Sequence, residues 1–132
     1  MTKDLAHRDR ATDLGLVRIS NEAISAIAQT AAMEVSGVHR MGGGFTKTLY
    51  EILFNKVGSK GVRIQMTDSE VKLAVSIVVE YGMDITRIAD EVQENVKRAV
   101  EKMAGLVISA VDVVVEGVHT QGLAEKQRPL KQ

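Results

Sequence analysis

The stretch that decides the fold is residues 71–118, VKLAVSIVVEYGMDITRIADEVQENVKRAVEKMAGLVISAVDVVVEGV. Apolar and polar residues alternate over 71–81, which predicts a strand with one buried face. Over 85–103 apolar residues recur every three or four positions, which predicts an amphipathic helix. The alternation returns over 107–115 and predicts another strand. This half of the chain is therefore expected to form a strand–helix–strand unit.

The first half of the chain predicts a similar set of elements. A short apolar segment at 16–19 predicts a strand, and the helix that follows begins at Ser20 or Asn21, whose side chains are good N-caps. Gly37 is placed where the end of a helix favours a residue that tolerates positive φ. Residues 61–70 predict a further strand and a hairpin turn that leads into the long strand.

The predicted order of elements is β-α-β-β-α-β, with a short extra helix inside residues 38–60. Two βα units around a hairpin predict an α+β fold, a two-layer sandwich in which the helices pack on one face of a mostly antiparallel sheet. A ferredoxin-like arrangement of the strands is the first expectation. The domain is expected to span residues 14–121, between flexible polar tails at 1–13 and 122–132.

Composition limits the possible classes of protein. The chain has 132 residues and no cysteine, which excludes disulfides, thiolate catalysis and cysteine-ligated zinc. It has 17 basic and 17 acidic residues, whereas strong nonspecific binding to nucleic acid usually needs a basic excess. No segment approaches the roughly 18 consecutive apolar residues of a membrane span, and the N-terminus lacks the apolar segment of a secretory signal. The expectation is a soluble cytoplasmic protein.

No group of residues in the sequence predicts catalysis, a cofactor or a metal ion. His7, His39 and His119 are far apart and have no ligand-like spacing, so solvated histidines are expected. Asp112 and Glu116 share one face of the last predicted strand, but neither a base nor a nucleophile accompanies them. The chain is therefore expected to be neither an enzyme nor a binder of a small-molecule substrate.

Several short motifs, taken in order, resemble one known family. They are residues 15–20, GLVRIS, the pairs Gly37-Val38 and Gly61-Val62, residues 78–85, VVEYGMDI, and the pair Gly105-Leu106. From about residue 15 to residue 121 the chain resembles the alkaline-shock protein family, the envelope-stress response proteins of Gram-positive bacteria and their relatives. Asp112 departs from the pattern, since the family often carries Asn there.

The resemblance implies a function but no catalytic residues. Such proteins are non-enzymatic cytoplasmic factors tied to envelope stress and membrane homeostasis. Some of them self-assemble, and some associate with the membrane through a separate membrane-anchored partner. The resemblance therefore implies a protein partner or a homo-oligomer, with the chain in the cytoplasm or held at the membrane by its partner.

Two surfaces are candidates for such an interaction. The first is the glycine-rich, aromatic and basic segment after the first helix, with the candidate residues Arg40, Gly42, Gly43, Gly44, Phe45, Lys47, Tyr50 and Phe54. The alternative for this segment is that its apolar residues only cover an edge of the sheet. The second surface is the outer face of the sheet, where apolar side chains stand among polar ones at Val78, Ile108 and Val114.

A small nucleic-acid-binding domain is the alternative function. A βα sandwich with a glycine-rich loop that carries Arg40, Lys47, Lys56 and Lys60 could grip a phosphate backbone. The neutral net charge and the lack of aromatic residues on the predicted strands argue against this alternative.

Overall fold

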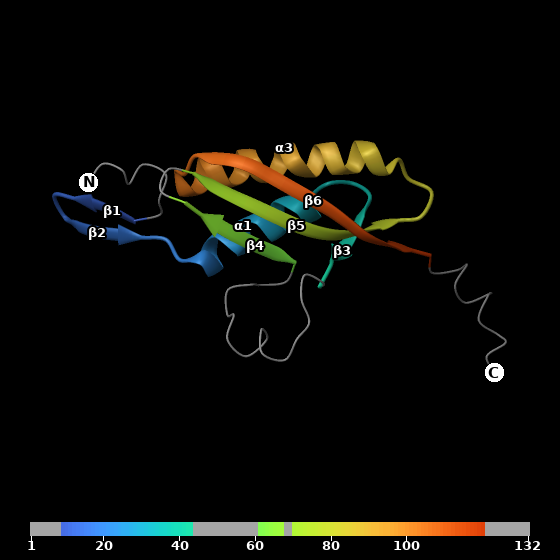
Figure 1. Cartoon of the computed structure of the whole chain (residues 1–132), viewed down its shortest axis with the longest axis horizontal. Coiled ribbons are helices and arrows are strands. Elements are labelled where there is room, and N and C mark those ends of the chain that lie inside the picture. Colours follow the sequence, from blue (N-terminus) through green and yellow to red (C-terminus); the bar gives the residue numbers. More distant parts are fainter. Residues whose placement is uncertain (1–8, 44–60, 68–69, 121–132) are drawn as a thin grey trace.

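The computed structural model describes residues 9–43, 61–67 and 70–120 (Figure 1). Its elements are β1 (Asp9–Thr12), β2 (Gly15–Arg18), α1 (Asn21–Met33), β3 (Val38–Met41), β4 (Val62–Met66), β5 (Val71–Glu80), α3 (Ile85–Ala104) and β6 (Ile108–His119). The predicted α+β class, with two helices and mostly antiparallel strands, is confirmed. The short helix expected inside residues 38–60, around 49–57, lies outside the described residues, whereas the start of that segment forms β3.

The main sheet has four strands, and β5 is its centre. Along one edge of β5, β6 runs parallel over its whole length. Along the other edge, β3 pairs antiparallel with residues 77–79 and β4 pairs antiparallel with residues 71–75. β3 and β4 are thus two halves of one edge, interrupted opposite Ser76. There the Gly42 amide donates to the Ser76 carbonyl oxygen at 2.8 Å, and the Ser76 amide donates to the Gly61 carbonyl oxygen at 2.8 Å.

β1 and β2 form a separate antiparallel hairpin, which pairs Arg10 with Val17 and Ala11 with Leu16. Figure 1 shows this hairpin extending beyond one end of the main sheet. Residues 9–12, expected in a flexible tail, form a strand here because β2 supplies their backbone partners. The ferredoxin-like expectation is wrong. That arrangement separates the two strands of a strand–helix–strand unit by another strand, whereas β5 and β6 are direct parallel neighbours.

Both helices pack on one face of the main sheet and enclose an aliphatic core. Its most deeply buried members come from α1, β5 and α3, and include Ile24, Ala28, Val71, Leu73, Val75, Ile77, Val79, Ile88, Val92, Val96 and Val100. The alternation of β5 and the three-and-four spacing of α3, both predicted from the sequence, are thereby confirmed. The opposite face of the main sheet carries the even-numbered residues of β5 and is called the outer face.

The helix ends follow the local chemistry of the sequence. The Ser20 hydroxyl accepts a hydrogen bond from the Ala23 amide at 3.1 Å, and the Asp84 carboxylate accepts one from the Arg87 amide at 3.3 Å. Each side chain thus satisfies one of the free amides of a first helical turn. Gly105 closes α3 with a φ of 71°, the left-handed conformation that glycine adopts without strain.

Gly37 has the positive φ expected of it, 105°, but for a different reason. α1 already ends at Met33, and Gly37 leads into β3, where its carbonyl oxygen accepts from the Glu80 amide at 2.8 Å. A Cβ at this position would lie 2.5 Å from the Cδ1 atom of Ile88. Glycine is therefore required here by the close approach of α3 as well as by the backbone conformation.

No helix within the described ranges is both long and apolar enough to cross a membrane. α3 has 20 residues, but its exposed face is charged over its whole length, at Arg87, Glu91, Glu94, Lys97, Arg98 and Glu101.

Candidate functional site

Three side chains from neighbouring strands meet on the outer face at the end of β5. His39 comes from β3, Glu80 from β5 and His119 from β6. The Nδ1 atom of His39 lies 3.0 Å from Oε2 of Glu80, and the Nδ1 atom of His119 lies 3.3 Å from Oε1. The two imidazole rings stack, with centroids 3.7 Å apart and planes within 5° of parallel. We call this group the His–Glu–His cluster.

Two β-bulges bring these side chains together, and both are next to Val78. On one side, Val38 pairs with Val79 and Arg40 with Val78, so His39 is an extra residue. On the other side, Val115 pairs with Ile77 and Gly117 with Val78, so Glu116 is an extra residue. An extra residue reverses the alternation of the side chains that follow it. His119 consequently pairs with Glu80 and shares its face of the sheet, where an unbroken alternation would place it on the helix side.

The cluster is partly open to solvent and is electrostatically complementary. The side chains of His39, Glu80 and His119 are 32%, 44% and 30% exposed. Hydrogen bonding from His39, and to a smaller extent from His119, holds the pKa of Glu80 below its usual value, so the carboxylate is ionised at neutral pH. An anionic oxygen pair between two imidazole nitrogens can bind a cation or share protons.

A second polar cluster lies beside the interruption of the edge strand. The Glu116 carboxylate accepts hydrogen bonds from the Ser76 hydroxyl at 2.9 Å and from the Gly43 amide at 3.2 Å. A Cβ on Gly42 would lie 2.5 Å from both the Cδ atom of Glu116 and the Oγ atom of Ser76. Through Glu116, β6 is therefore joined to β5 and to Gly43, which follows β3.

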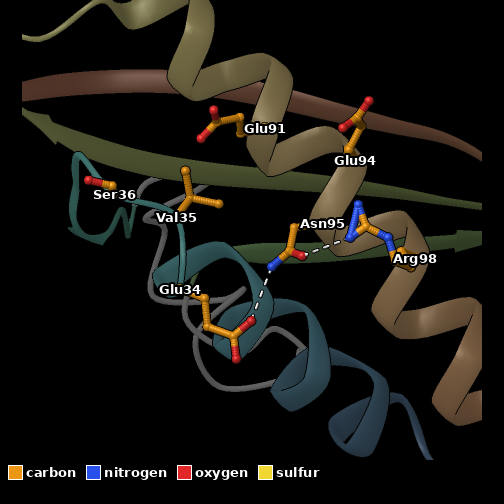
Figure 2. A pocket seen from close by; sticks show the side chains of 7 residues that line it. All are labelled: Glu34, Val35, Ser36, Glu91, Glu94, Asn95 and Arg98. Carbon is orange, nitrogen blue, oxygen red and sulfur yellow. Dashed lines mark hydrogen bonds between the residues drawn. The ribbon is translucent and has the colours of Figure 1, made fainter.

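A polar groove of about 340 Å³ lies where the end of α1 meets the middle of α3 (Figure 2). Figure 2 shows Asn95 pointing from α3 toward Glu34, to which it donates at 3.2 Å; it also donates to the Ala31 carbonyl oxygen at 2.8 Å. Arg98 donates to the Asn95 side-chain oxygen at 3.3 Å. These hydrogen bonds join the end of α1 to α3, so the polar side chains of Asn95, Glu34 and Arg98 are explained by the packing of the two helices and need no ligand.

The outer-face candidates are only partly where the sequence predicts them. Val114 is on the outer face and 45% exposed. Val78 is on the same face but only 5% exposed. Ile108 was expected on this face and is instead 2% exposed in the core, opposite Val71, because Ser109 forms another bulge that reverses the alternation.

Few of the candidates in the glycine-rich segment can be placed. Arg40 is exposed on β3 and donates to the Met41 carbonyl oxygen at 3.2 Å. Gly42 is buried against Ser76 and Gly43 is exposed. The remaining candidates lie outside the described residues, namely Gly44, Phe45, Lys47, Tyr50 and Phe54. The nucleic-acid alternative, which depends on the same segment, stays a prediction.

The expectation of solvated histidines is wrong for His39 and His119, because distant segments meet at Glu80. One signal in the sequence could have indicated this. The tripeptide Gly-Val-His occurs twice, at 37–39 and at 117–119. In the fold the two copies lie on opposite sides of β5, and the valine of each pairs with Val79.

Comparisons with known proteins agree with the motif-based resemblance. Residues 9–120 match the alkaline-shock protein 23 family, described as having a cell envelope-related function. The uncharacterized protein YqhY of Bacillus subtilis (strain 168) is 36% identical over 121 residues, which cover 91% of this chain and 87% of YqhY. The uncharacterized protein YloU of the same strain is 33% identical over 110 residues, 82% of this chain and 92% of YloU. Among solved structures, a MamM-CTD variant gives a TM-score of 0.46 at 20% sequence identity, over 75% of this chain and 95% of that chain. The chain belongs to the alkaline-shock protein 23 family, whose function is related to the cell envelope.

Proposed function

We propose that this chain serves its envelope-related role by non-covalent association with copies of itself, and that the β1–β2 hairpin is the contact. It acts as an envelope-stress or membrane-homeostasis factor and not as a catalyst. The assembled form presents many copies of one surface to a further protein partner, which can be membrane-anchored. The expected interaction through the segment around residues 40–56 belongs to this second step.

The hairpin carries the proposal because, within the described part of the chain, it pairs with no other strand and exposes apolar side chains. β1 pairs only with β2 among the described strands, and every residue of β2 is exposed. Leu14, at the turn, is 97% exposed, and Leu16 and Val17 are 62% and 41% exposed. A two-stranded hairpin alone is at best marginally stable in water, so burial against another surface would supply the missing stabilisation.

A second copy is the favoured occupant because each copy also carries a matching surface. β6 pairs with β5 alone within the described sheet. Side chains of α3 bond to the backbone of its first residues, at Ile108 and Val111, and the rest of its other edge is available to a further strand. Two apolar side chains on this strand, Val114 and Val118, are 45% and 42% exposed. The hairpin and β6 each offer a strand edge and apolar side chains, so two copies can pair through them without complementary charges. This suits a chain of zero formal net charge.

The polar clusters support binding rather than catalysis. Ser76 is 1% exposed and donates its hydroxyl proton to a carboxylate, whereas an activated serine needs a base to accept that proton and access to a substrate. Among the described residues, the imidazoles of the His–Glu–His cluster contact Glu80 and each other, and no hydroxyl nucleophile.

Light scattering on the purified chain tests the proposal. The wild type should show a mass above the 14.3 kDa of one copy that grows with concentration. The double variant Leu14→Ser/Leu16→Ser should return to 14.3 kDa with an unchanged circular dichroism spectrum. Met103→Ser is the matched control, because Met103 is 68% exposed on α3 and should leave the mass of the wild type unchanged. A wild type of 14.3 kDa at all concentrations, or a double variant that still assembles, contradicts the proposal.

A further inference from the structure

We infer that the His–Glu–His cluster is a binding site for a divalent transition-metal ion of the zinc type. The ligands are the Nδ1 atoms of His39 and His119 and one carboxylate oxygen of Glu80. The site is on the outer face of the main sheet, whereas the proposed self-association joins the hairpin to the edge of β6. Zinc binding and the mass of the assembly are measured separately, so each proposal can fail without the other.

Both nitrogen–oxygen distances within the cluster already match those between ligands of one ion. The ligand atoms of His39, Glu80 and His119 all lie within 4.8 Å of one another. The two nitrogen–oxygen distances are 3.0 Å and 3.3 Å. Ligand atoms bound to one tetrahedral zinc ion at about 2.0–2.1 Å lie roughly 3.3 Å apart. An ion can therefore enter between these atoms with little movement of the backbone.

The frame that holds the ligands is rigid, and only the imidazole rings need to turn. Each ligand is on a different strand, and the three strands are joined by backbone hydrogen bonds on both sides of β5. The rings are now parallel, so their Nδ1 lone pairs run side by side and do not converge. Rotation about the bond from Cβ to the ring brings them together, and the exposed third of each histidine leaves room for it.

The donor set selects the class of metal ion. Imidazole nitrogen favours zinc, copper, nickel and iron, whereas magnesium and calcium prefer all-oxygen sites. One carboxylate and two neutral imidazoles leave a bound dication with one net positive charge. Because the described part of the chain supplies three protein ligands and the cluster is partly exposed, a fourth position stays open to water or to a group from another molecule.

A simple hydrogen-bonded trio is the competing explanation of the same contacts. In that case each histidine donates its Nδ1 proton to Glu80, and the cluster only joins the strands. The two explanations differ in what zinc does. A metal site binds one ion through these three residues, while a hydrogen-bonded trio shows no specific affinity for any ion.

Isothermal titration of the untagged full-length chain with zinc chloride, after removal of metal by EDTA, separates these explanations. One zinc ion should bind per chain, and magnesium should not bind. His39→Gln, His119→Gln and Glu80→Gln should each weaken zinc binding by at least about tenfold, since loss of even an outer partner of a zinc ligand costs about 10–100-fold. His7→Gln and Glu116→Gln are the controls, and both should bind zinc as the wild type does.

X-ray absorption at the zinc edge of the zinc-loaded wild type identifies the ligands directly. They should include two imidazole nitrogens and at least one carboxylate oxygen. Unfolding of the metal-free variants, followed by circular dichroism, checks that each one folds. The inference is overturned by a wild type that binds no zinc. It is equally overturned if the folded double variant His39→Gln/His119→Gln binds zinc with the affinity of the wild type.

Discussion

The ring of His39 stacks on the ring of His119, with 3.7 Å between the ring centroids, although the two residues come from strands on opposite sides of β5. Both strands are held at the same residue, since Val38 and Val118 each pair with Val79. The two Gly-Val-His tripeptides therefore close this end of the sheet from both sides. Because the contact depends on both bulges, it forms only when β3 and β6 each pair with β5 in the observed register.

Loss of one ring should be visible at the other. Stacked imidazoles shift each other's proton signals through their π-electrons. In metal-free protein, His39→Ala should move the ring-proton signals of His119 toward those of a free histidine in a proton–carbon NMR spectrum. Glu116→Gln, also on the outer face, should leave them in place. Unmoved His119 signals in His39→Ala would show that the rings do not stack in solution.

Three glycines separate the cost of backbone strain from the cost of a steric clash. Gly37→Ala combines a φ of 105° with a contact of 2.5 Å to Ile88, so unfolding by urea should show a loss of at least about 2 kcal/mol. Gly82→Ala has a φ of 89° and free space, and should lose about 1 kcal/mol. Gly43→Ala has neither problem and should change stability by less than about 0.5 kcal/mol. A different ranking would contradict the close approach of α3 to Gly37.

Glu101 should make the stability of the fold depend on pH. Its carboxylate accepts a hydrogen bond from Lys97 at 2.8 Å and another from the Ile108 amide at 3.1 Å. Both hydrogen bonds lower the pKa of Glu101 from 4.5, and the one from Lys97 has the larger effect. A carboxylate whose pKa is lower in the folded than in the unfolded protein stabilises the fold at pH values above its unfolded-state pKa. This stabilisation is lost as the pH falls through its folded-state pKa.

Glu101→Gln should therefore be less stable than the wild type at pH 7 by up to about 1 kcal/mol, and the difference should vanish in acid. Thermal unfolding from pH 7 down to pH 3 measures it. Glu91→Gln is the control, because Glu91 pairs with Arg87 on the exposed face of α3 and has no backbone donor. A difference for Glu101→Gln that is the same at every pH would rule out this role of the carboxylate.

Ser25 in α1 and Ser20, the N-cap before it, should respond to alanine with opposite changes in stability. Ser25 is 1% exposed, and within the described residues its hydroxyl has no hydrogen-bond partner, so Ser25→Ala should raise the free energy of unfolding by about 1 kcal/mol. Ser20 caps the helix through the Ala23 amide, so Ser20→Ala should lower it by about 1 kcal/mol. Urea unfolding of both variants is the measurement, and a destabilised Ser25→Ala would indicate that the hydroxyl is satisfied in solution.

The parts of the fold that the sequence predicts well depend on local patterns. The periodicities of β5 and α3 and the caps at Ser20, Asp84 and Gly105 are all set by neighbours within one or two turns. Such patterns determine which elements form and which side of each is apolar. They do not determine which strand lies beside which, so the ferredoxin-like expectation was wrong.

The candidate sites depend on features that periodicity cannot supply. A single bulge at Ser109 puts Ile108 in the core, and another at Glu116 puts His119 beside Glu80. One extra residue in a strand moves every following side chain to the other face. The hairpin partner of β2 was missed for a related reason, since residues 9–12 are mostly polar and become a strand only through pairing.

Amide hydrogen exchange of the β1–β2 hairpin tests the central claim, self-association through this hairpin, most directly. The paired residues Arg10, Ala11, Leu16 and Val17 should exchange quickly in dilute protein, because an isolated hairpin opens easily. Their protection should rise with protein concentration, and Leu14→Ser/Leu16→Ser should remove that rise. Exchange of these amides at one rate across all concentrations, whether fast or slow, would contradict the claim.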